Sequence, residues 1–213
     1  SMKNILWLSS ILTLAACNFS NQKENVQAAW AFNEFVKLDS VNPILSPDTS
    51  YVFNCPVKNE SVRWQSKNVL NPTAFVKDGK VYLLYRAQDS AMTSRLGLAI
   101  SDDGIHFTKQ ASPVFYPSND SLLKYEWKGG VEDPRIVAMP DSGYLLTYTA
   151  YDGKTARLCF ATTYDLIHWE KRGPVLQSPK YINSWSKSGA MVVEKMGDKM
   201  VAKKIDGKYW MYF

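Results

Sequence analysis

Three stretches of the chain share one pattern of apolar and polar positions and predict three similar β-strands. Each stretch begins at a turn glycine and continues into a run rich in leucine, aromatic and β-branched residues. The runs are Gly79-Lys-Val-Tyr-Leu-Leu-Tyr-Arg-Ala87, Gly143-Tyr-Leu-Leu-Thr-Tyr-Thr-Ala150 and Gly207-Lys-Tyr-Trp-Met-Tyr-Phe213, and their glycines lie 64 residues apart. Such runs favour strands, and a constant step of this length indicates a repeated structural unit.

Two further strand signals recur at nearly the same step. Ala99–Phe107 is similar to Ala161–Trp169, and the closing aromatic residues lie 62 positions apart. Proline-bounded runs recur at Asn42–Pro47, Ser112–Pro117 and Gly173–Pro179. Together with a strand before each turn glycine, these signals give four short strands per unit. Repeated four-stranded units indicate an all-β fold of the β-propeller type, with blades arranged around a central channel.

Residues that recur at equivalent positions are interpreted as parts of the scaffold. His106 and His168 are the only two histidines of the chain and occupy the same place in successive repeats. We therefore expect both to be structural and to pack at a blade edge. Arg95 and Arg157 match in the same way, each at the start of a strand. Cys159 aligns with a glycine of the preceding repeat, which favours a small buried residue over a reactive thiol.

The start of the innermost strand differs between repeats and carries the candidate chemistry. Asn71-Pro72 in the first repeat corresponds to Asp133-Pro134 in the second, and the third counterpart is expected within Trp185–Met191. Proline suits the first residue of a strand, because it cannot donate a ladder hydrogen bond. Side chains at these points should gather at one mouth of the channel. The residues expected there are Asn71, Glu132, Asp133, Arg135, Lys187 and Ser188.

Arg86 is a further candidate for ligand contact. Its counterpart in the second repeat is Thr149, within Tyr148-Thr149-Ala150, so the scaffold itself does not require an arginine at this point. We therefore expect Arg86 to face the channel mouth rather than the outer surface of the blade.

Composition narrows the class of protein. The chain is 46% hydrophobic, 13% aromatic and 21% charged, which is typical of a globular domain with an aromatic excess that suits stacked sheets or sugar binding. The net charge is +5, but the basic residues are scattered, with no run longer than two. This distribution argues against a nucleic-acid partner.

The first residues predict an export signal. Lys3 precedes a short apolar stretch, Ile5–Leu14, which is too short to span a bilayer and is followed by Ala15-Ala16-Cys17. This ending resembles a bacterial lipobox and implies removal of residues 1–16 and lipidation of Cys17, with ordinary secretion as the alternative. Residues 17–37 would then be a tether, and 38–213 a single propeller domain. The expected location is that of an exported lipoprotein, in the periplasm or at the outer membrane, held to the membrane through its lipid alone.

The motifs at the channel mouth resemble glycoside hydrolase family 130. The resemblance rests on Asn71-Pro72, Tyr85-Arg86-Ala87, Gly130-Val-Glu-Asp-Pro-Arg-Ile136, Asp165–Trp169 and Lys187–Ala190, in this order. It implies a five-bladed propeller of four-stranded blades that cleaves β-mannosides. By resemblance, Asp133 is the general acid, and the groups around sugar and phosphate are Asn71, Arg86, Glu132, Arg135, Lys187 and Ser188. No cofactor or metal is implied.

Two reactions and one binding function stay open at this point. Inverting phosphorolysis would use inorganic phosphate as co-substrate and release mannose 1-phosphate. A β-mannosidase would instead need a second carboxylate to activate water, roughly 6.5–9.5 Å from the acid. Glu194, or a carboxylate outside this sequence, is the candidate. The third alternative is a non-catalytic lipoprotein that binds β-mannoside oligosaccharides in the same channel.

Counting repeats predicts that the sequence covers about the first half of a longer protein. The third repeat ends at Phe213, before any outer strand of its own. Five blades at this step would need roughly 310 residues. The run Leu38–Ser46 is expected to be an outer strand that closes the ring onto the last blade.

Overall fold

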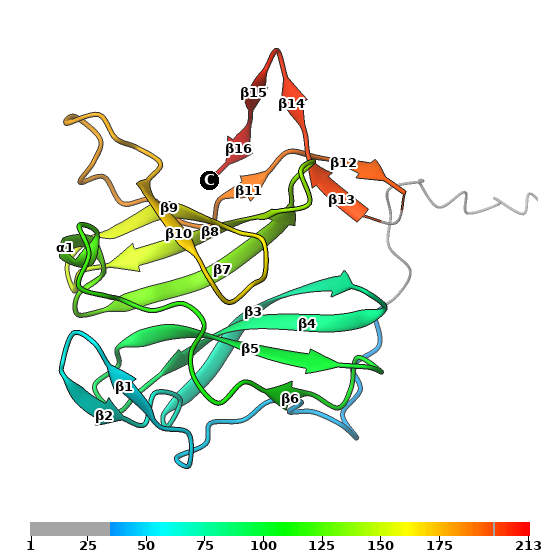
Figure 1. Ribbon diagram of the computed structural model, residues 1–213, viewed down its shortest axis with the longest axis vertical. Coiled ribbons are helices and arrows are strands. Elements are labelled where there is room, and N and C mark those ends of the chain that lie inside the picture. Colours follow the sequence, from blue (N-terminus) through cyan, green and yellow to red (C-terminus); the bar gives the residue numbers. More distant parts are fainter. Residues whose placement is uncertain (1–34, 198) are drawn as a thin grey trace, which may run out of the picture. The chain divides into compact units, whose positions relative to one another are not determined.

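Two groups of four antiparallel strands dominate the computed structural model, which describes residues 35–197 and 199–213 (Figure 1). A parallel bridge between Ser94 and Gly130 joins the two groups at one point, and each group is called a sheet below. Residues from Leu38 onward form one compact unit. The first sheet consists of β3 (Asn68–Lys77), β4 (Lys80–Gln88), β5 (Ser94–Ser101) and β6 (Thr108–Lys109). The second consists of β7 (Gly130–Ala138), β8 (Tyr144–Tyr151), β9 (Ala156–Thr163) and β10 (Glu170–Pro174). These two sheets confirm the first two predicted repeats.

The hairpins follow from the turn residues. Asp78 and Gly79, between β3 and β4, both have positive φ, at 51° and 74°. Asp206 and Gly207 repeat this pair, at 51° and 74°. Two successive residues of this kind make the tight turn whose twist matches that of the flanking strands. Gly79 and Gly207 therefore set the start of the strands that follow them, whereas in the β7–β8 turn the residue of positive φ is Ser142, at 69°.

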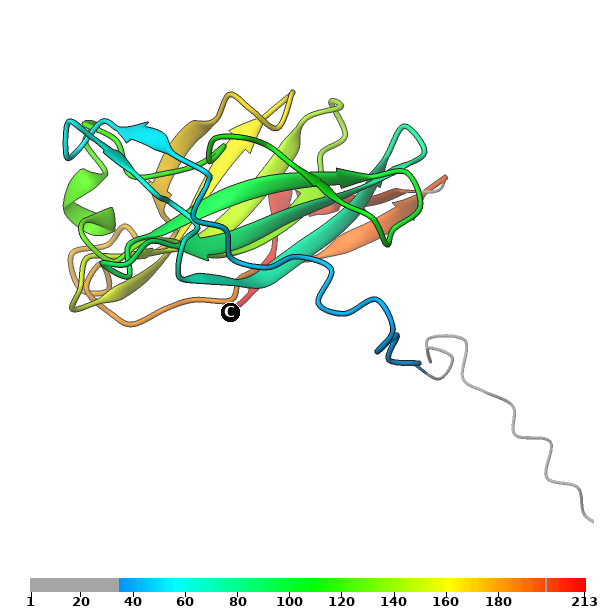
Figure 2. The same cartoon turned by 90° about the horizontal axis from the view of Figure 1, so that it is seen from below.

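The consecutive apolar residues of β4 are explained by burial on both faces of the first sheet. Leu84 packs with Leu96, Leu146 and Tyr148 in the core between the two sheets. Leu83 and Tyr85 face the opposite way, into a second core. That core is covered by the hairpin of β1 (Phe53–Cys55) and β2 (Glu60–Val62), together with the fully buried Trp64. Figure 2 shows the first sheet beneath this hairpin from a second direction.

The third repeat departs from the expected pattern. Its innermost strand is present as β11 (Ala190–Met191) and β14 (Lys204–Ile205), which pair with β16 (Met211–Tyr212) and β15 (Lys208–Tyr209). Between the two parts lies an inserted hairpin of β12 (Val193–Met196) and β13 (Lys199–Ala202), and Val201 of β13 forms a parallel bridge with Ala138 of β7. The predicted run from Gly207 therefore forms two short strands, β15 and β16, which pair with the two parts of the interrupted innermost strand.

The repeated scaffold residues are confirmed in position, and the histidines are corrected in environment. Arg95 and Arg157 are buried and pair with Asp89 and Asp152 at 2.8 and 2.7 Å. The histidines also occupy equivalent turns, and their Nδ1 atoms lie 2.7 and 2.6 Å from carboxylates three residues earlier. Their side chains are more than 80% exposed, however. They support their turns through this hydrogen bond and do not pack at the blade edge.

Two further expectations can be compared with the described residues. Leu38–Ser46 contains turns and no strand, so it is not an outer strand in this structure. Its link to the first sheet is a hydrogen bond from Lys109 Nζ to the carbonyl oxygen of Ser46, at 2.9 Å. Cys55 and Cys159 are both buried and unpaired, so these two residues form no disulfide.

The described part of the chain is all-β apart from one short helix, α1 (Leu123–Glu126), and its sheets do not close into a ring. The five-bladed propeller therefore stays a prediction. The predicted signal peptide and Cys17 lie outside the described residues. Among residues 35–197 and 199–213, no helix has the length and apolar character needed to cross a bilayer.

Candidate active site

One unusual backbone conformation recurs where the three innermost strands begin. Asn71, Asp133 and Ser188 are not glycines, yet their φ angles are 46°, 48° and 63°. In the first two repeats the strand ladder skips a register at this point, which is a β-bulge. Bulges redirect side chains, and non-glycine residues with positive φ are strained and concentrate at functional sites. The structure thus places Ser188 as the third counterpart of Asn71 and Asp133.

The bulges bring side chains of two sheets into contact. Asn71 of β3 donates a hydrogen bond from Nδ2 to Asp133 Oδ1, at 2.7 Å. Arg86 of β4 approaches the same oxygen with Nη1, at 3.2 Å. These residues are 62 and 47 positions from Asp133 in the sequence, and the neighbouring positions of β3, β4 and β7 in Figure 1 make the contacts possible. Asp133 is therefore held in place by two donors.

Glu132 lies behind Asp133 and is the main partner of Arg86. Arg86 Nη2 donates to Glu132 Oε1 at 2.6 Å, and the side chains of both residues are 14% exposed. Ser94 Oγ accepts from Arg86 Nε at 3.0 Å and donates to Glu132 Oε1 at 3.1 Å. The charge of Arg86 thus lies between the two carboxylates.

The pKa of Glu132 is raised above its usual value, and burial is the largest cause. The nearby charge of Asp133 raises it further. Arg86, the Ser94 hydroxyl and Lys187 lower it and oppose this shift.

A recess of about 380 Å³ lies on the exposed side of this network. Its lining residues lie at or beside the three positions of positive φ and are Asn71, Pro72, Thr73, Asp133, Pro134, Arg135 and Ser188. Asp133 reaches the recess while Glu132 does not. The side chains of Arg135 and Lys187 have no hydrogen-bond or ion-pair partner among the residues that the structure describes. The site thus combines one accessible carboxylate with two unpaired cations.

The predicted site residues are brought together, and one residue that sequence reasoning missed joins them. Ser94 was overlooked because its role depends on the approach of β5 to β7, which no local pattern reports. Gly130, with φ of 102°, allows that approach, since a Cβ atom there would lie 2.1 Å from the carbonyl oxygen of Ser94. Glu194, the candidate base, is not in this recess. It lies in the inserted hairpin and pairs with Lys203 at 3.3 Å.

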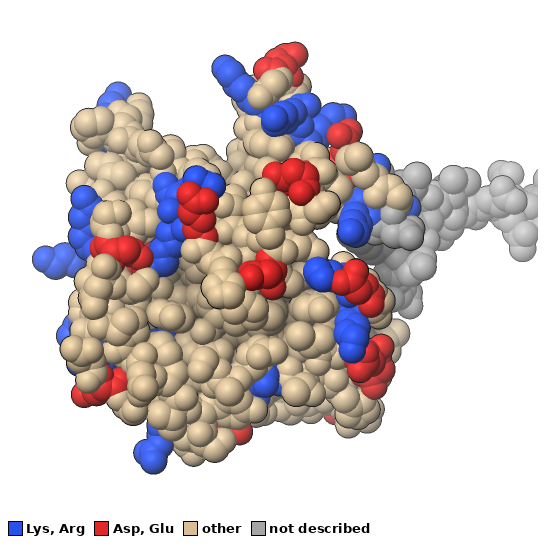
Figure 3. Space-filling model, in the orientation of Figure 1, with Lys and Arg blue, Asp and Glu red and all other residues tan. Residues whose placement is uncertain are grey.

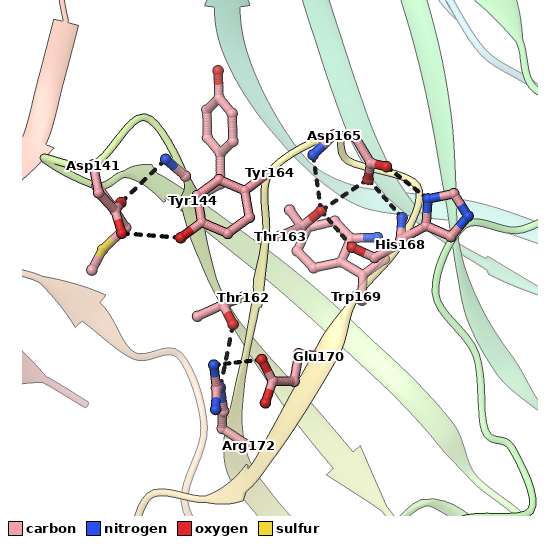
Figure 4. Close-up of a pocket in the computed structure, with 12 residues that line it drawn as sticks. Asp141, Tyr144, Thr162, Thr163, Tyr164, Asp165, His168, Trp169, Glu170 and Arg172 are labelled. Carbon is pink, nitrogen blue, oxygen red and sulfur yellow. Dashed lines mark hydrogen bonds and ion pairs between the residues drawn. The ribbon is translucent and has the colours of Figure 1, made fainter.

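A larger recess of about 580 Å³ is found at the other end of the second sheet (Figure 4). Its charged groups are already paired with one another: Asp141 accepts from Tyr164, Asp165 contacts His168, and Glu170 contacts Arg172. It contains none of the predicted site residues and offers no unpaired carboxylate. On the face drawn in Figure 3, acidic and basic side chains are interspersed.

Comparison with known proteins agrees with the motifs of this site. Residues 35–213 match the sequence profile of glycoside hydrolase family 130, which is described as β-1,4-mannooligosaccharide phosphorylase. The chain belongs to this family. The family 130 match covers the whole described part of the chain, including every residue of the recess.

Similar proteins include phosphorylases and hydrolases. A 1,2-β-oligomannan phosphorylase from Thermoanaerobacter sp. (strain X514) is 34% identical over 148 residues, which are 65% of this chain and 46% of that protein. A glycosyl hydrolase structure from Bacteroides ovatus is 42% identical, with a TM-score of 0.81, over 86% of this chain and 53% of that one.

A third comparison concerns a structure from work on family 130 glycoside hydrolases that target β-1,2 mannosidic linkages in Candida mannan. It is 44% identical, with a TM-score of 0.82, over 86% of this chain and 54% of that chain. The family 130 chain described here spans about half the length of the curated relatives it matches.

Proposed function

We propose that this chain carries the acid-bearing part of an enzyme that cleaves β-mannosides by inverting phosphorolysis. The observation that supports it most is the geometry of Asp133, which reaches a recess while Asn71 and Arg86 both contact its Oδ1 atom. In the proposed reaction, the Asp133 carboxyl gives its proton to the leaving glycosidic oxygen. A phosphate oxygen then forms the bond to the anomeric carbon from the opposite face, and the products are mannose 1-phosphate and the shortened saccharide.

Two cations support the choice of phosphate as nucleophile: Arg135, which lines the recess, and Lys187, which precedes the lining residue Ser188. Arg135 and Lys187 have no partner among the described side chains, so an incoming dianion would satisfy charges that are otherwise free. Phosphate arrives already anionic and needs no second carboxylate to activate it. This fits a site in which Glu132 is engaged by Arg86 and Glu194 lies elsewhere.

Hydrolysis of the same linkages is the second candidate, because the structure at 44% identity comes from work on family 130 hydrolases that target β-1,2 mannosidic linkages. A hydrolase would draw its base from a part of the protein outside this recess. We further propose that the whole protein is a five-bladed propeller, since half the length of its relatives accounts for two complete four-stranded sheets and part of a third.

One assay separates these functions. The full-length protein, of which this chain is proposed to be about half, is incubated with β-1,2- and β-1,4-linked mannooligosaccharides, with and without inorganic phosphate, and mannose 1-phosphate and free mannose are quantified. Phosphorolysis gives mannose 1-phosphate that depends on phosphate, and hydrolysis gives mannose that does not. Binding of the saccharide without either product would leave only the non-catalytic lipoprotein alternative.

The location is a separate proposal. We propose that the protein is an exported lipoprotein anchored through Cys17, on the basis of the lipobox-like end of the export signal. Metabolic labelling with a radioactive fatty acid should mark the wild-type protein and not Cys17→Ser. Equal labelling of both, or of neither, would contradict it.

A further inference from the structure

A large aromatic side chain stands in solvent next to the candidate active site. Trp185 is 65% exposed, although the adjacent Ser186 is 8% exposed and therefore buried. The indole ring contacts the ring of Tyr151, with ring centroids 6.3 Å apart and planes tilted by 58°. An exposed tryptophan supported by a second ring is an unusual use of apolar surface and suggests contact with a ligand.

The backbone that carries Trp185 is fixed to the second sheet on both sides. Ser186 N donates to the carbonyl oxygen of Ala156 at 3.0 Å, and Ser186 Oγ accepts from Leu158 N at 3.1 Å. A few residues later, the Gly189 carbonyl oxygen accepts from Thr147 Oγ1 at 2.7 Å. The indole is thus presented from an ordered segment, so that little conformational entropy is lost when a ligand binds.

The buried Arg157 fixes the preceding part of the same loop. Its Nε donates to the carbonyl oxygen of Ile182 at 2.9 Å, and its Nη2 donates to Asn183 Oδ1 at 2.7 Å. The equivalent Arg95 of the first repeat instead contacts Asp89, Thr93 and Cys55. Of the two equivalent arginines, Arg157 therefore holds the Trp185 loop and Arg95 has other partners.

The two rings lie at the end of the strands where the acid is found. Tyr151 is paired with Gly130 in the β7–β8 ladder, three residues before Asp133. Three extended residues span about 10 Å. Trp185 likewise precedes Ser188, the third residue of positive φ at a strand start, by three positions. The pair of rings is therefore at the same end of the second sheet as the recess, and neither ring is among the residues that line it.

We propose that Trp185, supported by Tyr151, is a stacking platform for a mannosyl unit of the substrate beyond the two sugars that flank the cleaved bond. The electron-rich face of an indole attracts the C–H groups on one face of a pyranose, and the contact removes apolar surface from water. The platform would make the enzyme prefer oligosaccharides to disaccharides. This inference rests on the proposed function.

The test compares substrates of different length, assayed with the full-length protein. For Trp185→Ala, kcat/KM for a mannotetraose should fall by about 3- to 10-fold through a higher KM, while kcat/KM for mannobiose is unchanged. Trp185→Tyr should restore most of the preference for the longer substrate. Tyr164→Ala is the matched control, since Tyr164 is 70% exposed and lies beyond the opposite end of β9.

The outcomes distinguish the platform from the proposed function. Equal losses on mannobiose and mannotetraose, or no loss on either, would overturn the platform while leaving the function intact. If wild type converts no mannoside, the proposed function fails. The platform is then judged by calorimetric titration with mannotetraose, in which Trp185→Ala must bind more weakly than both wild type and Tyr164→Ala; equal affinities would overturn it.

Discussion

Replacing Arg86 with methionine tests whether the carboxylate pair depends on this one cation. The change keeps most of the side-chain volume but removes three hydrogen bonds, to Ser94 at 3.0 Å, Glu132 at 2.6 Å and Asp133 at 3.2 Å. Breaking a buried ion pair by removing one partner costs about 3–5 kcal/mol. Because both side chains of the Arg86–Glu132 pair are still 14% exposed, we expect the lower end, about 3 kcal/mol. For a chain of this size, that corresponds to a fall in Tm of about 6–12 °C.

The pH dependence gives the prediction its sign. The pKa of Glu132 is raised above its usual 4.5 in the folded protein, so protonation of this carboxyl favours folding. This contribution to stability is fully present below pH 4.5, the usual pKa of the group, and is lost as the pH rises through the raised pKa of the folded state. Arg86 lowers that pKa, so its removal raises the pKa further and deepens the loss. The difference in stability between wild type and variant should therefore be small at acid pH and should widen as the pH rises above about 4.5.

The measurement is thermal unfolding followed by circular dichroism between pH 4 and pH 8. Lys58→Met is the matched control, because the Lys58–Glu60 pair is likewise an ion pair, at 3.0 Å, but its side chains are 31% and 58% exposed. We expect it to cost about 0.2–1 kcal/mol. Adding Glu132→Gln to Arg86→Met should recover part of the loss. A deficit no larger than the control, or one that is constant with pH, would refute the argument.

Three further predictions concern residues that support the two sheets. Lys171→Met should destabilise the fold by about 3–5 kcal/mol, since it leaves the fully buried carboxylate of Glu126 without its cation. The loss of stability, measured by denaturant unfolding, should shrink at acid pH because burial already raises the pKa of Glu126. Cys159 should resist alkylation in the native state and react on unfolding, since the thiol is 1% exposed and its pKa is raised to about 12; rapid labelling of the folded protein would contradict this. Gly130→Ala should cost far more stability than Gly79→Ala, because both have positive φ but a Cβ at Gly130 meets the backbone of β5 while a Cβ at Gly79 meets nothing within 4 Å; equal Tm values would argue against the close approach.

The repeats could be predicted from the sequence because the signals that define them are local. Turn glycines such as Gly79 fix the hairpins, and alternating or continuous apolar runs fix the strands, so the first two sheets follow the pattern. The chemistry at Asn71 and Asp133 was also visible, since both precede proline at equivalent strand starts. What a single sequence could not show is that both residues adopt positive φ and meet at 2.7 Å across two sheets.

The errors have physical causes. The hairpin of β12 and β13 was missed because it interrupts a strand whose two halves still pair with β15 and β16. Leu38–Ser46 carries the proline pattern of an outer strand, but a strand also needs a neighbour for its backbone groups, and no sheet edge in the described residues pairs with it. The histidines repeat because each turn reuses the same carboxylate contact, and repetition alone says nothing about burial.

The central claim is that Asp133 delivers the proton to the leaving oxygen. Asp133→Asn keeps an oxygen that can accept from Asn71 and Arg86, so the fold should survive with an unchanged Tm. Turnover of mannooligosaccharides by the full-length protein should fall by about 10²- to 10⁴-fold, the usual contribution of a general acid. Turnover of an aryl mannoside with a good leaving group should fall much less, because that leaving group needs less help from a proton. Asp141→Asn, in the recess at the other end of the sheet, is the control and should retain activity. Near wild-type turnover of mannooligosaccharides by a folded Asp133→Asn variant would contradict the account.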